Sequence, residues 1–528
     1  MLFTSYSFIA FLAVVILLYY VFPKKARWTL LLVASCAFYA FADYRYLFFI
    51  AVTALSAYFA ALRLERLNNT QKEYIGKNKD TLSSEEKKRY KEEIKKKKWR
   101  LLLLCLFLNL GILSVTKYTN FVIANINHFL SDASKLSPVD LIIPMGISFY
   151  TFQTLSYVID VYRAKTSAQH NFFRLFLFVS FFPQLVQGPI SRYGDLSETL
   201  YEGHSFSAHG FSMGLMRVLW GYFKKVVIAD RIITGVTSLI GSPEQYKGVY
   251  VFIATMFYAF ELYCDFTGGI DITIGIAEMM GIKVAENFNL PYFSKNIKEY
   301  WNRWHITMGT WFTDYIFYPI SVCGPMLKLS KWSRQHLGQN IGKRVTVYLS
   351  SLAVWLATGI WHGAAWNFIV WGLMNYVVIM ASQEMEPLYA RFHKRFNVSG
   401  KPLYEVFQII RTVLLMSFIR MFDCYRNVPL TFRMVGTVFT TFNFSAFTDG
   451  SLLKIGLTGA DYIVLLAGFV IVLSVSLVKV KVGNVREYVY ESSNALFYVL
   501  AALLLVMTVV FGAYGVGYDS AQFIYNQF

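Results

Sequence analysis

Long apolar stretches, separated by short polar breaks, run through most of this chain. Five of them are long or nearly long enough to cross a hydrocarbon core of ~30 Å: residues 7–21, 28–40, 101–115, 462–477 and 495–512. Because a bilayer holds no water that could pair with exposed backbone groups, segments that lie in lipid must be helical. The pattern therefore predicts an all-α, polytopic integral membrane protein.

The composition supports this interpretation. The chain of 528 residues is 56% hydrophobic and only 16% charged, so it has far more apolar surface than a soluble core of this length needs. The first apolar run, Phe8 to Val21, has no basic stretch before it and no small-residue cleavage site after it. A removable signal peptide would show both features, and we therefore expect this run to be the first membrane helix.

The middle of the chain is less regular. Within residues 141–282, apolar runs such as "SFFPQLVQGPISR" and "GYFKKVVIADR" carry Gly, Pro and charged residues. These features predict broken or re-entrant helices, which a membrane permits only where protein or a water-filled cavity covers the freed backbone. We predict about 11–13 membrane helices, such segments included, around a central funnel. No repeat or linker is found, so residues 1–528 are expected to form one membrane domain.

The net charge of +18 is unevenly distributed. Residues 63–100 contain 14 Lys or Arg and 7 Asp or Glu, which favours a helical, cytoplasmic hairpin over a nucleic-acid-binding surface. This insertion either contacts anionic headgroups or is simply solvated. The basic segments Lys24 to Arg27 and Val478 to Arg486 are also expected inside, which places both termini outside a cell membrane, inner or plasma.

Five cysteines are scattered along the chain without any Cys-x-x-Cys pair. Several of them stand inside apolar runs, where cysteine behaves as a small hydrophobic residue. The sequence therefore indicates packing cysteines, and it predicts neither a disulfide framework nor a metal site.

Two of the eight histidines, His305 and His362, stand in stretches dense in Trp and Phe. A neutral imidazole can take a proton from a hydroxyl that attacks a carbonyl, and an ionisable side chain in such surroundings is a functional hypothesis by default. Gly359 and Gly363 would leave room for a substrate chain beside His362, and three tryptophans would exclude water from it: Trp361, Trp366 and Trp371. The alternative is a pair of hydrogen-bonded core histidines among packing aromatics.

Four carboxylates form a second cluster in apolar surroundings: Glu261, Asp265, Asp271 and Glu278. Glu261 and Asp265, four residues apart, share one helix face, and Thr267-Gly268-Gly269 is expected to break that helix. These acids either line a polar cavity or proton path, or they cap broken helix ends and pair with Arg303 or Lys224.

The motifs in order are "MLFTSYSFIAFL", "MGISFYTFQTLSYVIDVYR", "VSFFPQLVQGPISR", "FKKVVIADR", "YCDFTGGIDITIGIA", "NFNLPYFSKNIKEYWNRWHITMGTWFTDYIFYP", "GIWHGAAWNFIVWG" and "FIRMFDCYRNVPLTF". Together they make the chain resemble the membrane-bound O-acyltransferases, in the branch that acetylates bacterial surface polysaccharides such as alginate. Only the charged insertion and the segment around residues 441–461 lack the resemblance. It implies an acyltransferase.

This resemblance assigns roles to residues of the chain. It places the family's invariant histidine on His362 and the second conserved histidine on His305. Lower-ranked motif positions, expected to line the cavity or support it, are Asp265, Asp271, Asn289, Arg303, Trp361 and Asn367. The chain departs from the family pattern at Thr313, at Asn375 and in residues 321–344, which replace a shorter loop. These departures bear on the substrate rather than on the class.

The end of the chain, "AQFIYNQF", is similar to an aromatic carboxyl-terminal motif in which a tyrosine holds the acyl group in transit. That residue would be Tyr525, in an extracytoplasmic tail of residues 517–528. A phenol with a pKa of ~10 needs a base to become a nucleophile, and its ester is then an activated donor. The alternative is a frayed terminus in a chain rich in aromatic residues.

The resemblance implies a relay in which acetyl-CoA is the donor substrate and no cofactor is bound permanently. The acyl group would pass to an extracytoplasmic serine acyltransferase partner, of the SGNH type or another, which places it on a cell-surface glycan. Membrane lipid would surround the chain, and no nucleic acid is involved. Two alternatives are a D-alanyl transferase for teichoic acids that uses a carrier-protein thioester, and a transporter that moves an acyl donor or glycan through the cavity.

Overall fold

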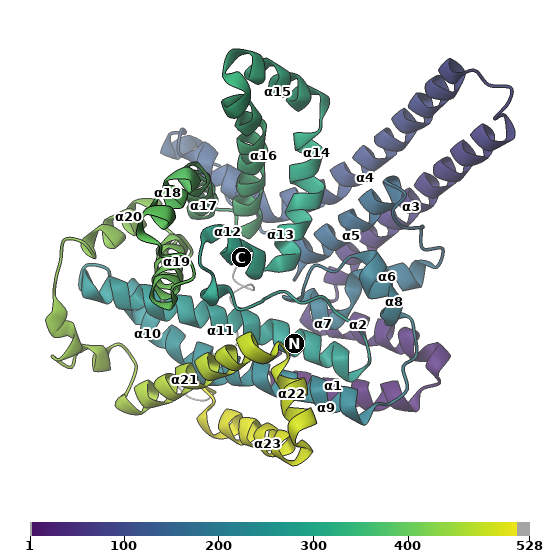
Figure 1. The fold of residues 1–528 in the computed structure, drawn as a ribbon. Helices are drawn as coiled ribbons and strands as arrows, with labels where there is room; N and C mark the ends of the chain where they lie inside the picture. Colours follow the sequence, from purple (N-terminus) through teal and green to yellow (C-terminus); the bar gives the residue numbers. More distant parts are fainter. Residues whose placement is uncertain (1–2, 515–528) are drawn as a thin grey trace. The chain divides into compact units, whose positions relative to one another are not determined.

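The computed structural model describes residues 3–514, so Tyr525 and the predicted tail lie outside the described residues. Over the described part the chain forms helices and no strand, which confirms the all-α prediction (Figure 1). Seven helices are long and apolar enough to cross a membrane: α3 (Tyr46–Lys77), α4 (Ser84–Asn127), α11 (Val249–Met279), α16 (Gly338–His362), α19 (Pro402–Tyr425), α21 (Gly459–Val482) and α23 (Asn494–Phe511). The helix pair α17 (Trp366–Glu384) and α18 (Glu386–Phe396), bent by 51°, would be an eighth.

The prediction of about 11–13 membrane helices also counted segments that are shorter than these spans. The two predicted spans nearest the amino terminus form α1 (Tyr6–Val21) and α2 (Arg27–Asp43), of 16 and 17 residues. At a rise of about 1.5 Å per residue, each falls a few ångströms short of the hydrocarbon core of a membrane.

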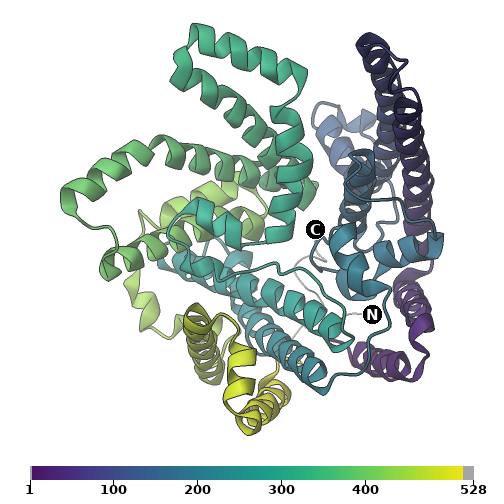
Figure 2. The same ribbon diagram turned by 45° about the vertical axis from the view of Figure 1, so that its right-hand side comes forward.

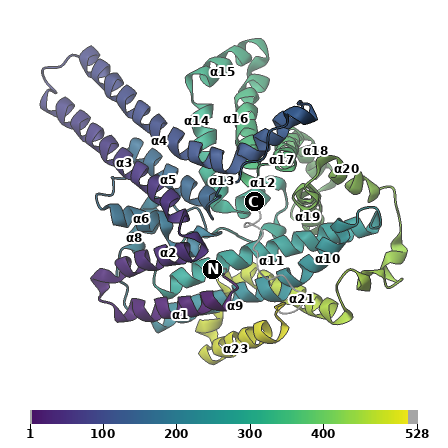
Figure 3. The ribbon, with the colours of Figure 1, turned by 180° about the vertical axis from the view of Figure 1, so that it is seen from behind.

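The described chain divides into two compact units, of which the first comprises residues up to Gly214 and Ile276–Ala285. Its most prominent feature is the hairpin of α3 and α4, which carries the charged insertion and extends as two long helices (Figures 1 and 3). Ser83 caps α4 by accepting a hydrogen bond from the Glu86 backbone N–H at 3.2 Å, and the Glu86 carboxylate accepts one from the Ser83 N–H at 2.8 Å. This capping box fixes the turn, and the predicted helical hairpin is confirmed.

The rest of this unit consists of the short helices expected from its Gly and Pro residues. They are α5 (Ile147–Tyr162), α6 (Phe172–Ser180), α7 (Phe182–Leu185) and α8 (Tyr193–Leu200), together with α9 (Ala208–Tyr222), which runs on into the second unit. Gly146 precedes α5 with a φ of +72°, in a place where a Cβ atom would overlap the Leu185 carbonyl oxygen. Only glycine meets both demands, so the break before α5 is built into the sequence.

The second unit contains α11, and here one prediction is wrong. The segment Thr267-Gly268-Gly269 does not break the helix, which continues from Val249 to Met279. A Cβ atom on Gly268 would lie 2.9 Å from the Gly221 carbonyl oxygen. The glycine therefore serves the close approach of α9 rather than a helix end.

Several shorter helices connect the long ones in this unit. They are the π-helix η3 (Phe223–Ala229), α10 (Asp230–Gly241), α12 (Ile297–Arg303), α13 (Ile306–Phe312), the π-helix η5 (Thr313–Phe317), α14 (Tyr318–Ser321), α15 (Gly324–His336), α20 (Val428–Thr437) and α22 (Val485–Ser492). The departure from the family pattern at residues 321–344 forms α15 and the start of α16, which pack side by side (Figures 1 and 2).

The carboxyl-terminal helices are fastened to the core of the second unit. The guanidinium of Arg231 pairs with Asp461 and donates to the Phe511 carbonyl oxygen at 2.6 Å. The backbone N–H of Ala513 donates to the Val226 carbonyl oxygen at 2.8 Å. Ala513, which follows α23, is therefore held beside η3.

Candidate active site

His362 is the last residue of α16, and its side chain is only 6% exposed. The ring of Trp371 meets it edge to face at a centroid distance of 4.5 Å. The rings of Trp361 and Phe368 lie at 5.0 and 6.5 Å. Because α16 ends here and α17 begins at Trp366, the imidazole lies at a helix turn enclosed by aromatic rings.

His305 is completely buried and precedes α13 with a φ of +48°. This left-handed conformation is rare for a residue with a side chain and is found mostly where the surroundings enforce it. Here Asn287 enforces it, because its side-chain oxygen accepts hydrogen bonds from the Thr307 backbone N–H at 3.0 Å and the Thr307 hydroxyl at 2.9 Å. The same oxygen lies 3.2 Å from the Nδ1 atom of His305.

The contact with Asn287 also decides the protonation of His305. An amide oxygen only accepts hydrogen bonds, so Nδ1 of His305 carries the proton and Nε2 carries the lone pair. Burial, aided by the charge of Arg420, lowers the pKa of His305 to about 3. The imidazole is therefore neutral near pH 7, with Nε2 as its basic atom.

One indole connects the two histidines. The ring of Trp361 lies 6.0 Å from that of His305 and 5.0 Å from that of His362, between ring centroids. Phe266 covers His305 on another side at 4.9 Å. The structure thus brings together His305, Trp361 and His362, from α13 and α16, in an enclosed aromatic centre that we call the His–Trp–His centre.

Two details of the predicted surroundings of His362 are wrong. Trp366 is 58% exposed and does not wall the site, whereas Trp361 and Trp371 are buried. Gly359 leaves no room for a substrate, because a Cβ atom there would lie 2.6 Å from the Phe368 carbonyl oxygen. Gly363 likewise lies against the Phe368 ring. These glycines allow α16 and α17 to pack closely.

Arg420 and Asp423, on α19, are buried site residues that the sequence analysis missed. The guanidinium of Arg420 lies over three indole rings, with centroids 5.6, 4.9 and 5.1 Å away: Trp301, Trp304 and Trp371. It also pairs with the Asp423 carboxylate at 3.2 Å. Trp371 therefore touches both Arg420 and His362. An Arg and an Asp three residues apart in the apolar run "FIRMFDCY" could have indicated this pair.

Two of the four predicted carboxylates form the ion pairs that the second interpretation expected, but they cap no broken helix end, because α11 is continuous. Asp265 pairs with Lys225 at 2.6 Å, and Asp271 pairs with Lys224 at 2.7 Å. The proposed pairing with Arg303 is wrong, because that residue forms an ion pair with Glu299 on its own helix at 2.6 Å. One oxygen of Glu261 is buried without a hydrogen-bond partner among the described residues.

The two predicted asparagines have different surroundings. Asn289 is exposed, while its neighbour Asn287, two residues earlier in "NFNLPYF", is the buried residue that holds His305. Asn367 is buried, and its amide donates to the Phe422 carbonyl oxygen at 3.1 Å, which ties α17 to α19. No cluster of His, Cys, Asp or Glu among residues 3–514 could hold a metal ion.

The fold and the site together define an all-helical membrane protein in which two buried histidines adjoin one indole. The chain belongs to the membrane-bound O-acyltransferase family, whose sequence model matches residues 98–422. It is therefore an O-acyltransferase, and this result decides between the enzyme and the transporter that the cavity pattern had left open.

Relatives from several organisms are similar to this chain. A protein described as a probable alginate O-acetylase, from Azotobacter vinelandii, is 29% identical over 475 residues, which cover 89% of this chain and 84% of that protein. The peptidoglycan O-acetyltransferase of Helicobacter pylori is 30% identical over 425 residues, or 74% and 72% of the two chains. A teichoic acid D-alanyltransferase from Bacillus subtilis is 29% identical over 245 residues, 46% of this chain and 59% of that protein.

Proposed function

We propose that this enzyme transfers an acetyl group from cytoplasmic acetyl-CoA toward a cell-surface polysaccharide or cell-wall glycan, with His362 as the catalytic base. The observation that carries the proposal is the His–Trp–His centre, in which two buried imidazoles adjoin one indole. The relatives that acetylate alginate and peptidoglycan support a glycan as the final acceptor.

The chemistry requires a hydroxyl acceptor and a base. His362 takes the proton of the hydroxyl while its oxygen attacks the thioester carbonyl. The tetrahedral intermediate collapses, the carbon–sulfur bond breaks, and the CoA thiolate receives the proton from the imidazolium. His305, neutral and with Nε2 as its basic atom, assists this proton transfer or orients the acceptor. Buried aromatic rings exclude the water that would hydrolyse the acyl group.

The acceptor in our proposal is Tyr525. Ala513 is held beside η3, and Tyr525 lies 12 positions further along the chain. An extended chain spans at most about 3.5 Å per residue, so the tyrosine can reach sites within roughly 40 Å of that point. The aryl ester then donates its acetyl group to the serine hydroxyl of an extracytoplasmic partner acyltransferase, which transfers it to a sugar hydroxyl.

A D-alanyl transferase is the second candidate, supported by the shorter match to a teichoic acid D-alanyltransferase. The two candidates differ in the donor, free acetyl-CoA or a D-alanyl thioester on a carrier protein. Each donor, carrying a labelled acyl group, is offered separately to the purified full chain.

The label is then mapped by mass spectrometry. We expect acetyl-CoA to label Tyr525 in the wild type and in Tyr514→Phe, a matched control near the end of the chain, but not in Tyr525→Phe or His362→Ala. Labelling by the carrier-protein thioester alone would favour the D-alanyl transferase. Release of CoA without label on Tyr525 would contradict the carrier role.

A further inference from the structure

The charge of the insertion at residues 63–100 is concentrated at the base of the α3–α4 hairpin, where the two helices leave their apolar runs. Residues 63–68 and 95–100, which form this base, contain seven Lys or Arg and one Glu. Residues 69–94, which we call the tip segment, contain seven Lys or Arg and six Asp or Glu. The net positive charge therefore lies almost entirely at the base, whereas solvation alone would favour no such separation.

Side-chain contacts show that the basic ends of the two helices lie at the same level. The amide of Asn109 on α4 donates to the Ser56 hydroxyl on α3 at 2.9 Å. Further along the hairpin, the ammonium of Lys98 donates to the side-chain oxygen of Asn68 at 2.6 Å. Because the helices are antiparallel, this register brings residues 63–68 of α3 beside residues 95–100 of α4.

The end of α5 reaches the same level. The side-chain amide of Asn68 donates to the Val161 carbonyl oxygen at 3.2 Å, and the ring of Tyr162 lies 5.1 Å from the ammonium of Lys98. Three elements thus contribute exposed cations that form no ion pair among the described residues. We call these cations the basic belt: Arg63, Arg66, Lys95, Lys96, Arg100 and Lys165.

On α3, an exposed apolar face leads directly into the basic belt. Phe59 is 64% exposed, and at spacings of four and seven residues it shares its helix face with Arg63 and Arg66. An exposed phenylalanine in a membrane span contacts the hydrocarbon tails of lipids. The two arginines lie about 6 and 10 Å further along the helix axis, where the tails give way to headgroups.

The same order of residues recurs on α4, with an aromatic marker of the membrane boundary. Phe107, which is 82% exposed, shares one helix face with Leu103, Arg100 and Lys96. Trp99 is 49% exposed and lies beside Arg100 on this side of the helix. Because indole rings collect at the level of the headgroups, Trp99 indicates that the cations of α4 also lie at the membrane surface.

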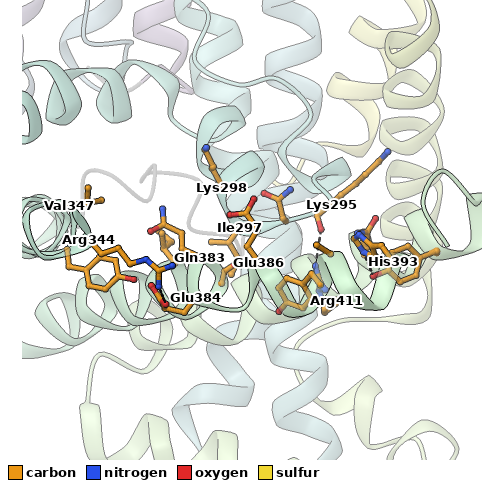
Figure 4. A pocket seen from close by; sticks show the side chains of 18 of the residues that line it. Lys295, Ile297, Lys298, Arg344, Val347, Gln383, Glu384, Glu386, His393 and Arg411 are labelled. Atoms are coloured by element: carbon orange, nitrogen blue, oxygen red, sulfur yellow. Dashed lines mark hydrogen bonds and ion pairs between the residues drawn. The ribbon is translucent and has the colours of Figure 1, made fainter. Parts of the chain in front are cut away.

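The pocket in Figure 4 is a second basic region of the described chain, but its charge is arranged differently. Arg344 stands beside Glu384, with which it pairs, and Lys295 pairs with Glu405 at 2.5 Å. Those cations surround a hollow of about 720 Å³, whereas the basic belt lies on helix faces that continue a lipid-facing surface. The belt therefore suits an extended, anionic surface rather than a small molecule.

We propose that the basic belt binds the phosphate groups of anionic phospholipids in the cytoplasmic leaflet. Guanidinium and ammonium groups form charge-assisted hydrogen bonds with phosphate oxygens, and Lys/Arg clusters directly cytoplasmic of a membrane helix attract anionic headgroups. One lipid fits both parts of the surface, because its tails lie along Phe59 or Phe107 while its phosphate reaches the belt. The nearly neutral tip segment remains in solvent and takes no part.

Two variants of the full chain, each with four cations replaced, separate the belt from the overall charge of the hairpin. The belt variant is Arg63→Gln/Arg66→Gln/Lys96→Gln/Arg100→Gln. The tip variant, made at exposed lysines of the tip segment, is Lys72→Gln/Lys77→Gln/Lys88→Gln/Lys91→Gln. A third variant keeps the charge of the belt by exchanging Arg for Lys, and Lys for Arg, at the first four positions.

The measurement is the electron paramagnetic resonance spectrum of spin-labelled lipid around each protein, reconstituted in phosphatidylcholine bilayers. The immobilised fraction of spin-labelled phosphatidylglycerol, relative to that of spin-labelled phosphatidylcholine, gives the preference for the anionic lipid. The belt variant should lower this preference about threefold, whereas the tip variant and the charge-conserving variant should keep it. Added salt should weaken the preference of the wild type. Equal melting temperatures in detergent verify that all variants are folded.

Three results would overturn the proposal. An unchanged preference in the belt variant would show that these cations are merely solvated. An equal loss in the belt and tip variants would assign the effect to the net charge of the hairpin rather than to the belt. A belt variant that keeps its lipid preference, but no longer binds an acidic soluble protein that the wild type binds, would make the belt a protein-binding surface.

Discussion

Arg420 shows how a single buried residue can hold the side chains of the active site in place. Its guanidinium lies over three indoles and pairs with Asp423, and one of those indoles, Trp371, packs against His362. Planar guanidinium groups stack on aromatic rings and tolerate burial better than an ammonium does. We infer that Arg420 is a positioning residue that keeps the indole of Trp371 against the imidazole.

Substituting Arg420→Met should therefore lower both stability and activity. The change leaves the Asp423 carboxylate buried without its partner, which costs about 3–5 kcal/mol, and Arg420→Met/Asp423→Asn should recover part of the loss. Chemical unfolding in detergent measures this. Arg45→Gln, which removes an exposed ion pair with Asp43, serves as the control and should change little. Equal losses in the two variants would contradict the role of Arg420.

The burial of His305 predicts how the stability of the protein depends on pH. Burial lowers its pKa in the folded protein to about 3, against ~6.5 in the unfolded chain. Between these values the unfolded state binds a proton that the folded state does not, so stability falls as the pH falls below about 6.5. The melting temperature of the wild type should drop more between pH 7 and pH 5 than that of His305→Gln. An equal drop would mean that His305 is protonated in the folded protein.

At the scale of helices, glycines set the distances between elements. Gly359 of α16 and Gly372 of α17 allow these two helices to cross closely, and Gly221 does the same for α9 and α11. A small residue at such a crossing brings backbones into contact, which is how helices associate where lipid offers no hydrophobic driving force. The α16–α17 crossing also fixes the place of His362 relative to Trp371.

Enlarging Gly359 tests this packing. Gly359→Ala should cost about 1–3 kcal/mol through overpacking, and it should slow acyl transfer because it moves α17 away from His362. Unfolding in detergent and the rate of acyl transfer measure the two effects. Gly111→Ala on α4 is the matched control, since its Cβ atom would meet nothing within 4 Å. Unchanged activity in Gly359→Ala would show that the crossing does not hold the site.

The sequence predicts elements well where local pattern decides them. The α3–α4 hairpin follows from the charged insertion of residues 63–100, and the short helices of the middle of the chain follow from the Gly and Pro residues in their apolar runs. The sequence fails to predict an element where tertiary contacts decide its structure. The pair Gly268-Gly269 has the pattern of a helix break, yet α11 is continuous because α9 packs against the glycine.

The same limit applies to the candidate site. His305 and His362 stand out because ionisable groups are rare among tryptophans, but nothing in the sequence says that both adjoin Trp361. Of the two asparagines in "NFNLPYF", only the fold selects Asn287 as the one that contacts His305. Likewise the sequence suggests that glycines beside His362 make room for a substrate, whereas they accommodate a neighbouring helix.

At the scale of the whole molecule, charge predicts orientation. The tip of the α3–α4 hairpin should lie in the cytoplasm and the segment after α4 outside. In a variant whose five cysteines are replaced by serine, Asp132→Cys should react with a membrane-impermeant maleimide in intact cells. Thr81→Cys should react only after the membrane is opened. The reverse pattern would invert the predicted orientation of the hairpin.

The central claim is that His362, held in a buried aromatic centre, performs the acyl transfer. Its most direct test is the single-turnover rate at which labelled acetyl-CoA acetylates the full chain. His362→Ala should lower this rate by about 10²–10⁴, the contribution of a general base, while His336→Ala on the exposed part of α15 should leave it unchanged. A folded His362→Ala protein that acetylates within twofold of the wild-type rate would contradict the account.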